Sequence, residues 1–346
     1  MNILQIEPAT NFSGGANQML LNSFELKKRG HRVYAACVKD SPVYKILSDK
    51  SFDIVEIDEG KKYFSAQIIR NFLKNNSIDI VHTHHSKGHT IGILSLIGRK
   101  KERLVVQRGV IFPTANIFKY WNPRVDKFIA NSKAVKNVMK RYFVRANKIA
   151  VVYSAVDEKE FANFHRDAVR SEFDFRDKFV FGIVGNYSDY KGHDMLLEAF
   201  SRIKNKNILL VIIGKDTEKL AKKTQQLKID DKVRILGFRK DARKIIKGFD
   251  CFVVPSLKES FPNAVIEAFF MKVPVVGTNV GGIPELLGSD RGILCKPDAN
   301  ALKDALVKAL NSDLKQLINN AYKFANDNLT IEKKIDRLEA IYKELI

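Results

Sequence analysis

Short apolar runs alternate with amphipathic stretches along the first half of the chain. The first run, Asn2–Glu7, precedes a glycine-containing turn and a helical stretch over Ala16–Arg29, which Gly30 ends. Alternation of buried strands with helices is typical of a mostly parallel sheet covered on both faces. Further strands are expected at His31–Val38, Phe52–Ile57, Ile78–His82, Leu104–Gln107, Lys127–Ala130 and Ile149–Val152.

The same pattern begins again near Lys178, with strands expected at Phe179–Gly185, Ile208–Gly214, Val233–Gly237, Cys251–Pro255 and Val273–Thr278. The 346 residues exceed what one hydrophobic core usually supports. The sequence therefore predicts an α/β protein with two tandem Rossmann-like domains, 1–160 and 161–330. A last helix within 331–346 is expected to cross back to the first domain. Ligands of such sheets bind beyond the carboxyl ends of the strands, so we expect the domains to face a central cleft.

The charge of the chain indicates an anionic partner. The 59 lysines and arginines exceed the 39 acidic residues and give a formal net charge of +20. Nucleotide phosphates, nucleic acid and an acidic membrane are the partner classes that such a surface attracts. Within 99–148 the basic residues face only Glu102 and Asp126.

Two interpretations of this basic segment remain open. Ser132–Phe143 reads as an amphipathic helix, and the preceding Ile117–Trp121 mixes aromatic with basic residues. Together they resemble a patch that contacts an anionic membrane surface. Alternatively, the apolar stripe of the helix packs on its own domain. For the charge as a whole we favour peripheral contact with a membrane.

Cysteine usage and hydropathy favour a cytoplasmic location, with any membrane contact at the inner face. Cys37, Cys251 and Cys295 are far apart and form no zinc-binding pattern, which suits buried thiols in a reducing compartment. The first residues lack the basic start of a signal peptide, and no apolar run approaches the length of a membrane span.

The strongest chemical signal is the nonapeptide Glu259–Glu267, which follows a predicted strand and has a glutamate at each end. Pro262 can hold the turn and Asn263 can cap the helix that follows. Free N–H groups at the start of that helix would bind an anion. The carboxylates there can accept hydrogen bonds from sugar and ribose hydroxyls. A capped helix with two surface glutamates is the plainer alternative.

This nonapeptide resembles that of glycosyltransferase family 4, the retaining enzymes with the GT-B architecture. Gly185–Gly192 is similar to the donor-phosphate loop of the family, and Val280–Glu285 to its Gly-Gly-x-Pro-Glu turn. Val233–Phe238 is similar to the strand that ends beside the nucleobase, and Ser13–Gly15 to a glycine-rich loop. The resemblance covers nearly the whole chain and is most specific over 180–290.

The resemblance implies a role for each matching residue. Glu259 would contact the transferred sugar, Glu267 the ribose, and Lys191 the diphosphate, where it would stabilise the leaving nucleotide. Gly15 would allow close backbone approach to the same diphosphate. The remaining donor-binding residues implied are Gly185, Asn186, Phe238, Phe261, Pro262, Asn263, Ala264 and Val265.

Two positions depart from the family pattern. Asn186 stands where a basic residue is usual, and Lys215 is a candidate to replace that cation. Arg108 stands where a histidine is usual beside the donor sugar. An arginine cannot act as a base. We nevertheless take Arg108 as a catalytic candidate that would hold an anionic acceptor or the leaving phosphate.

A histidine cluster, His82, His84, His85 and His89, follows one predicted strand. Imidazoles bind zinc, copper or nickel, but a substrate-binding or structural role is favoured over a metal site. His84 and His85 are assigned to the acceptor side, and His82 is expected to pack at the strand end. Asp-x-Asp, the metal-binding motif of other glycosyltransferases, is absent from the sequence. We therefore expect neither a metal nor another cofactor.

The resemblance to family 4 implies a retaining glycosyltransferase. It would move a sugar from a nucleotide-diphosphate sugar to a hydroxyl of a glycan or glycolipid acceptor, in bacterial cell-surface polysaccharide or lipopolysaccharide synthesis. A nucleotide-sugar epimerase and a non-catalytic binder of glycans or RNA are the alternatives. The basic segment has no recognised RNA-binding signature, so no nucleic acid partner is expected.

Overall fold

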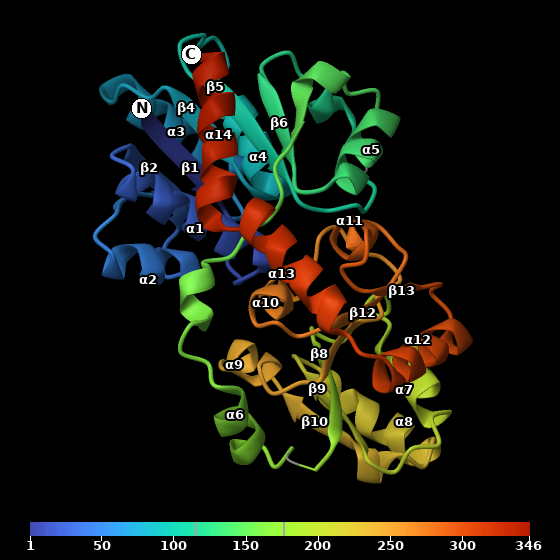
Figure 1. Ribbon diagram of the computed structural model, residues 1–346. Helices are drawn as coiled ribbons and strands as arrows, with labels where there is room; N and C mark the ends of the chain where they lie inside the picture. The colour runs from blue at the N-terminus through green and yellow to red at the C-terminus, as the bar shows by residue number, and fades with distance from the viewer. Residues whose placement is uncertain (115, 176) are drawn as a thin grey trace. The chain divides into compact units, whose positions relative to one another are not determined.

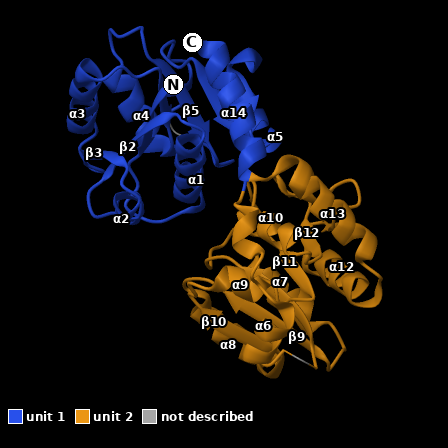
Figure 2. Ribbon diagram, turned by 60° about the vertical axis from the view of Figure 1, so that its left-hand side comes forward, with its two compact units in different colours: residues 1–155, 331–346 blue, residues 156–330 orange. Residues whose placement is uncertain are grey.

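The computed structural model describes residues 1–114, 116–175 and 177–346 (Figure 1). It divides the chain into two compact units (Figure 2). Unit 1 comprises Met1–Ala155 and Ile331–Ile346, and unit 2 comprises Val156–Thr330. Residue 115, within the basic segment 99–148, lies outside the described residues.

Unit 1 contains a seven-stranded parallel sheet in the order β3-β2-β1-β4-β5-β6-β7. Its strands are β1 (Asn2–Glu7), β2 (Arg32–Val38), β3 (Asp53–Ile57), β4 (Ile80–Thr83), β5 (Arg103–Arg108), β6 (Lys127–Ala130) and β7 (Ile149–Val151). Its helices are α1 (Gly14–Lys28), α2 (Pro42–Asp49), α3 (Lys62–Asn75), α4 (His85–Ser95), α5 (Lys133–Arg141) and α14 (Ile331–Leu345). Short 3-10 turns lie at Phe118–Tyr120 and Ala146–Lys148.

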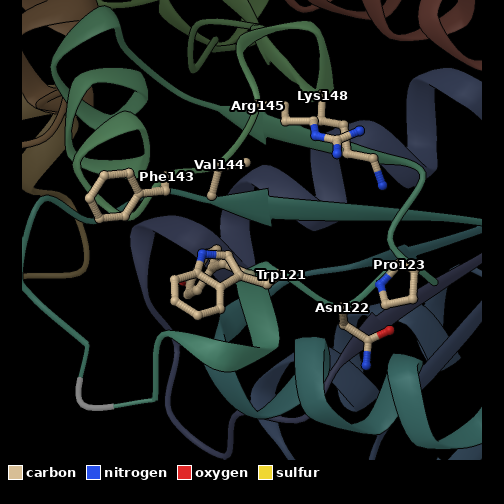
Figure 3. A pocket seen from close by; sticks show the side chains of 8 residues that line it. Trp121, Asn122, Pro123, Phe143, Val144, Arg145 and Lys148 are labelled. Atoms are coloured by element: carbon tan, nitrogen blue, oxygen red, sulfur yellow. The ribbon is translucent and has the colours of Figure 1, made fainter.

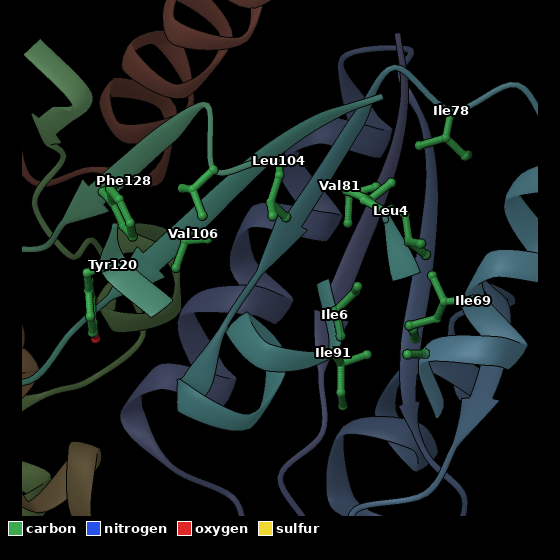
Figure 4. Close-up of a cluster of buried hydrophobic side chains, with 14 of the residues drawn as sticks. Leu4, Ile6, Ile69, Ile78, Val81, Ile91, Leu104, Val106, Tyr120 and Phe128 are labelled. Atoms are coloured by element: carbon green, nitrogen blue, oxygen red, sulfur yellow. The ribbon is translucent and has the colours of Figure 1, made fainter. Parts of the chain in front are cut away.

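Alternating side chains of these strands form two apolar layers, as the pattern predicts for a sheet covered on both faces. On one face, Leu4, Val81, Leu104 and Phe128 belong to a single buried cluster (Figure 4). On the other face, strand residues including Ile3 pack with Ile335, Leu338 and Tyr342 of α14. The last helix of the chain is therefore part of the core of unit 1.

The structure decides how the helix in the basic segment packs. Val135 and Met139 of α5 are fully buried in the core of unit 1. Ser132 begins the helix and accepts a hydrogen bond from the backbone N–H of Val135 at 3.1 Å. The apolar stripe of α5 is thus occupied by its own domain, and this helix presents no apolar face to a membrane.

Unit 2 contains a six-stranded parallel sheet in the order β10-β9-β8-β11-β12-β13. Its strands are β8 (Phe179–Val184), β9 (Ile208–Ile213), β10 (Val233–Gly237), β11 (Cys251–Val254), β12 (Val275–Thr278) and β13 (Ile293–Cys295). Its helices are α6 (Arg166–Glu172), α7 (His193–Ser201), α8 (Ala221–Gln226), α9 (Ala242–Ile246), α10 (Asn263–Phe270), α11 (Ile283–Leu287), α12 (Ala299–Asn311) and α13 (Lys315–Asn328). Glu158–Phe161, Thr217–Leu220 and Asp230–Lys232 form 3-10 turns.

The predicted α/β class and the tandem Rossmann-like sheets are confirmed, and the predicted strands appear within a few residues of their expected bounds. The sequence analysis missed the edge strand β13, which has three residues. Among the described residues, no helix is both long enough and apolar enough to cross a membrane.

Candidate functional site

Two charged side chains meet beyond the carboxyl ends of neighbouring strands in unit 2. Lys191 lies in the loop after β8, and Glu259 lies in the loop after β11, the strand that pairs with β8. Lys191 Nζ is 2.7 Å from Glu259 Oε2. The lysine side chain is 30% exposed and the glutamate 10%, so the pair stays accessible to a ligand. The structure therefore brings together the two residues with the strongest catalytic assignments.

A glycine allows the Lys191 loop to lie close to the end of β11. The backbone carbonyl of Tyr190 accepts a hydrogen bond from the N–H of Leu257 at 2.7 Å. Gly192 has φ +73°, and a Cβ atom there would lie 1.9 Å from the carbonyl oxygen of Pro255. Only glycine satisfies both constraints, so the Lys-Gly pair places the ammonium group beside Glu259.

The glycine pair after β12 supports the Glu259 loop from the other side. Gly282 N–H donates to the carbonyl oxygen of Glu259 at 3.1 Å. A Cβ atom on Gly281, which has φ +55°, would lie 1.7 Å from that same oxygen. These glycines therefore set the position of the Glu259 backbone. The sequence marked this turn only by resemblance and did not indicate what it supports.

Helix α10 begins beside Glu259 without a side-chain cap. The N-cap residue is Pro262, and the helix starts at Asn263, so the prediction that Asn263 caps it is wrong. The side chains of Phe261, Pro262 and Val265 are buried, whereas Asn263 and Ala264 are partly exposed. The first turn thus offers backbone N–H groups to an anion, as helix N-termini do.

Glu267 lies in α10 and is almost fully buried. Its Oε1 is 2.9 Å from Nε of Arg243, and Nη1 of the same arginine is 2.6 Å from Oε2 of Glu160. Burial raises the pKa of Glu267, while the charge of Arg243 acts in the opposite direction. The sequence gave no signal for Arg243, because it stands 24 residues before the glutamate it pairs with.

Asn186 acts within the protein scaffold. Its Oδ1 accepts a hydrogen bond from the backbone N–H of Lys215 at 3.0 Å. Gly214 also lies against this loop, because a Cβ atom there would be 2.1 Å from the carbonyl oxygen of Gly185. Lys215 Nζ lies 5.3 Å from the ring centre of Phe238, which is 58% exposed at the end of β10. The structure therefore joins Gly185, Asn186, Lys215 and Phe238 at one edge of unit 2.

In unit 1, Arg108 lies inside the domain. The residue is 6% exposed, donates to the hydroxyl of Tyr120, and donates to the carbonyl oxygen of Phe112 at 2.6 Å. Its guanidinium also lies near the rings of Tyr120 and Tyr142. This placement disagrees with the catalytic assignment of Arg108, because the side chain is buried and both Nη groups donate within its own domain.

The histidine cluster is divided by burial. His84 is 2% exposed and bonds to Gln5 Oε1 at 2.7 Å, whereas His82 bonds to the hydroxyl of Tyr342 at 2.6 Å. Burial lowers the pKa of His82 to about 3 and that of His84 well below its usual value. The acceptor-side assignment of His84 therefore conflicts with its burial, and His82 packs as expected. His85, the first residue of α4, is exposed.

Gly15 is exposed in the first turn of α1, where Ser13 Oγ accepts a hydrogen bond from the N–H of Ala16 at 3.2 Å. This helix start lies beyond the carboxyl end of β1, as the glycine-rich loop predicts. Across the described part of the chain, no three histidine, cysteine or acidic side chains gather in a way that could hold a metal ion.

Several relatives resemble this chain in sequence. N-acetylgalactosamine-N,N'-diacetylbacillosaminyl-diphospho-undecaprenol 4-alpha-N-acetylgalactosaminyltransferase of Campylobacter jejuni is 26% identical over 80% of this chain and 78% of its own. UDP-Gal:alpha-D-GlcNAc-diphosphoundecaprenol alpha-1,3-galactosyltransferase of Escherichia coli is 25% identical over 96% and 94%. An uncharacterised glycosyltransferase of Methanocaldococcus jannaschii is 28% identical, and the match spans 63% of each chain, less than two thirds of that relative.

Solved structures share the fold. A glycosyltransferase from Rickettsia africae superposes with a TM-score of 0.89 at 24% identity, over 99% of this chain and 98% of its own. Anabaena HepE in complex with UDP-glucose superposes with a TM-score of 0.87 at 17% identity, over 99% and 100%. Both likenesses support the two-domain GT-B fold.

Family models match both units. Residues 12–160 match the Glycosyltransferase Family 4 model, and residues 165–324 match the model of Glycosyl transferases group 1. The segments with the site residues of unit 2, from Gly185 to Glu267, lie inside the second match. The chain therefore belongs to the group 1 glycosyltransferases of family 4.

Proposed function

We propose that this protein transfers a sugar from a nucleotide-diphosphate sugar to a hydroxyl group of a glycan or lipid-linked acceptor, with retention of configuration. The ion pair of Lys191 and Glu259 carries the proposal, because it joins a cation for a phosphate to a carboxylate for sugar hydroxyls beside a helix N-terminus. The relation to Anabaena HepE, whose structure contains UDP-glucose, supports a nucleotide-sugar donor.

The donor would bind along the carboxyl edge of the sheet in unit 2. Lys191 and the N–H groups of the first turn of α10 would neutralise the diphosphate. Glu259 would accept hydrogen bonds from the sugar and Glu267 from the ribose. Phe238 offers an exposed ring to the nucleobase, and the Gly185–Asn186 loop would lie against the phosphates. In unit 1, Gly15 at the start of α1 stays a candidate for close approach of a phosphate to the backbone.

In the proposed transfer, the bond between the anomeric carbon and the diphosphate oxygen breaks. The acceptor oxygen bonds to that carbon from the same face, and its proton moves to the leaving diphosphate oxygen. Stabilising the negative charge on the leaving group is the main task left to the protein. Lys191 would supply that stabilisation, so we propose that the reaction requires neither a divalent metal nor another cofactor.

The names of two relatives suggest the kind of acceptor. The Campylobacter jejuni and Escherichia coli transferases are named for diphospho-undecaprenol substrates. We therefore propose a lipid-linked or surface glycan acceptor, as in bacterial polysaccharide or lipopolysaccharide synthesis, reached in the cytoplasm at the inner face of the membrane. His85 is the exposed histidine of the cluster and the better candidate for acceptor contact.

The epimerase alternative is weaker on physical grounds. It would need acid and base groups that exchange protons with a bound sugar. His82, His84 and His89 are each at most 2% exposed, and burial lowers the pKa of each imidazole. They are therefore poorly suited to that exchange.

Thermal unfolding with UDP, GDP, ADP and CMP, each at millimolar concentration with a chelator, tests the donor assignment. A nucleotide at about 100 times its dissociation constant should add roughly 2.7 kcal/mol to the free energy of unfolding. We expect one diphosphate to raise the melting temperature selectively, and Lys191→Met to reduce that shift. If no nucleotide raises the melting temperature, the proposed donor site is wrong.

A further inference from the structure

Three aromatic side chains near the basic helix α5 extend into solvent. Phe118 is 71% exposed, Trp121 48% and Phe143 83%. Phe118 and Trp121 pack edge to face, with ring centres 5.5 Å apart. Since the apolar stripe of α5 is buried in unit 1, these rings form a separate apolar surface on the same segment. Contiguous exposed aromatic surface with a polar rim marks interaction sites.

Trp121 and Phe143 also line a pocket of about 370 Å³ in unit 1. Tyr120 and Val144 contribute further apolar surface, and Arg145 and Lys148 contribute two cations. Figure 3 shows the two basic side chains along one side of the pocket and Trp121 on the facing side. Of the described residues that line the pocket, none is acidic. The pocket thus combines aromatic surface with positive charge.

The pocket lies in unit 1, away from the ligand edge of that unit's sheet. Asn122 and Pro123 precede β6, while Arg145 and Lys148 precede β7. These residues therefore lie at the amino ends of β6 and β7, whereas ligands of such sheets bind beyond the carboxyl ends of the strands. β7 is also the edge strand of the sheet, so the pocket belongs to its outer end.

Local structure holds the aromatic rim in place. Trp121 Nε1 donates to the carbonyl oxygen of Tyr142 at 2.6 Å, and Lys148 Nζ donates to that of Val125 at 2.7 Å. Phe143 has φ +58°, a left-handed conformation that bulky residues rarely adopt. A large apolar side chain is thus kept exposed on a strained backbone directly after α5.

The positive charge around the pocket is not cancelled by the acidic residues of this segment. Glu102 is paired with Arg99, and Asp126 is paired with Arg124 at 3.0 Å. Lys140 and Arg141, in the last turn of α5, are exposed two to three residues before Phe143. An anion that reaches this surface therefore meets several cations and no free carboxylate among the described residues of the segment.

We propose that this pocket and its aromatic rim dock unit 1 on an anionic phospholipid bilayer. Arg145 and Lys148 bind a lipid phosphate, while Trp121 and Phe143 lie at the boundary between headgroups and acyl chains. Exposed tryptophan and phenylalanine side chains are buried at that boundary in proteins that bind a membrane surface, and basic residues near it are attracted by anionic lipids. A bilayer supplies both components at once, which a soluble phosphate does not. The inference does not depend on the identity of the sugar donor.

Vesicle co-sedimentation of the full chain tests the docking. We expect binding to vesicles of phosphatidylcholine with about one third phosphatidylglycerol, and little binding to phosphatidylcholine alone. Each basic residue at such a surface contributes about fivefold to partitioning, so Arg145→Gln with Lys148→Gln should lower partitioning roughly 25-fold. The control variant Lys45→Gln with Lys50→Gln removes the same charge near β2 and β3, at the opposite edge of the sheet from β7. This control should change partitioning less than twofold.

The aromatic component is tested at Phe143. Asparagine accepts a left-handed backbone, so the Phe143→Asn variant should fold, and its partitioning to vesicles should fall several-fold. The Phe143→Trp variant should partition like the wild-type protein. Equal loss in the Lys45/Lys50 control, or unchanged binding in the Arg145/Lys148 variant, would overturn the proposal. Full displacement by millimolar glycerol phosphate would instead point to a soluble ligand and overturn the bilayer assignment. Nucleotide-induced thermal shifts of all variants, which report on unit 2, should match the wild-type protein.

Discussion

The two units have the same kind of parallel sheet but differ in how exposed the polar side chains at its carboxyl edge are. In unit 2, Lys191 and Glu259 form an ion pair that remains partly exposed. In unit 1, Arg108, His82 and His84 are buried and bonded to neighbours of their own domain. A residue type at a strand end is therefore a weak indicator of function until its exposure is known.

The difference has an energetic basis. Burying a charge is unfavourable unless partners replace its water, and a buried group that is already bonded has little left to offer a ligand. Lys334 of α14 is an extreme case in unit 1: it is 3% exposed, and its Nζ donates to Gln18 Oε1 at 2.8 Å. Substitutions in the polar interior of unit 1 should therefore change stability, and those at the open pair of unit 2 should change transfer.

Glu259→Gln should have the largest effect. It removes the charge that faces Lys191 and the proposed sugar contact, so kcat/KM for transfer should fall about 100- to 1,000-fold while the melting temperature changes little. Steady-state transfer assays measure this. Glu172→Gln is the matched control, because it breaks the surface ion pair with Lys244 in the same unit. Near-wild-type transfer by Glu259→Gln would contradict the catalytic assignment.

Lys334→Met should stabilise unit 1 without reducing transfer. Burial lowers the pKa of Lys334 from 10.5 to about 7. Between pH 7 and 10.5 the Lys334 side chain holds a proton in the unfolded chain but not in the folded chain, so stability rises with pH over this range. The lysine therefore destabilises the fold most below pH 7, and its destabilising effect disappears toward pH 10.5. The variant should gain about 2–4 kcal/mol of unfolding free energy at pH 6 and much less at pH 10.

Denaturant titrations at the two pH values measure that gain. Lys343→Met provides the comparison, because Lys343 is exposed on the same helix. Equal stabilisation by both variants, or a gain that grows with pH, would mean that burial of the Lys334 ammonium is not the cause.

Arg243→Met should change the pH dependence of donor binding. Arg243 and Glu160 are the charged groups that act on buried Glu267, and the arginine favours its ionised form. Without it the pKa of Glu267 rises further, so the loss of nucleotide affinity on acidification should begin at a higher pH. Calorimetric titrations between pH 5 and 8 measure this shift. Lys244→Met, which alters the adjacent cation, should leave the profile unchanged.

His85→Asn should have the smallest effect. Asparagine tolerates the φ of +61° at this position, so the start of α4 should be preserved. If His85 contacts only the acceptor, its KM should rise two- to fivefold while kcat and the KM for the donor stay constant. A fall in kcat with unchanged acceptor KM would exclude that role.

Much of the fold and the main residues of the candidate site could be predicted from the sequence. Strand–helix alternation in each half predicted two parallel sheets, because the spacing of apolar residues in a strand and in a helix is a local property of the chain. The nonapeptide gave a local signal of its own, whereas Lys191 was assigned to the site only through the resemblance to family 4. The meeting of Lys191 with Glu259 follows from strand order, since β8 and β11 are neighbours.

Only the tertiary structure decided which polar groups face solvent and which are held inside. Arg108 and His84 have the residue types of a functional site, but both are buried and bonded to Tyr120 and Gln5. Arg243 gives no local signal, and it is brought to Glu267 by the packing of α9 on α10. Burial and pairing depend on contacts between distant segments, so the pattern of neighbouring residues does not record them.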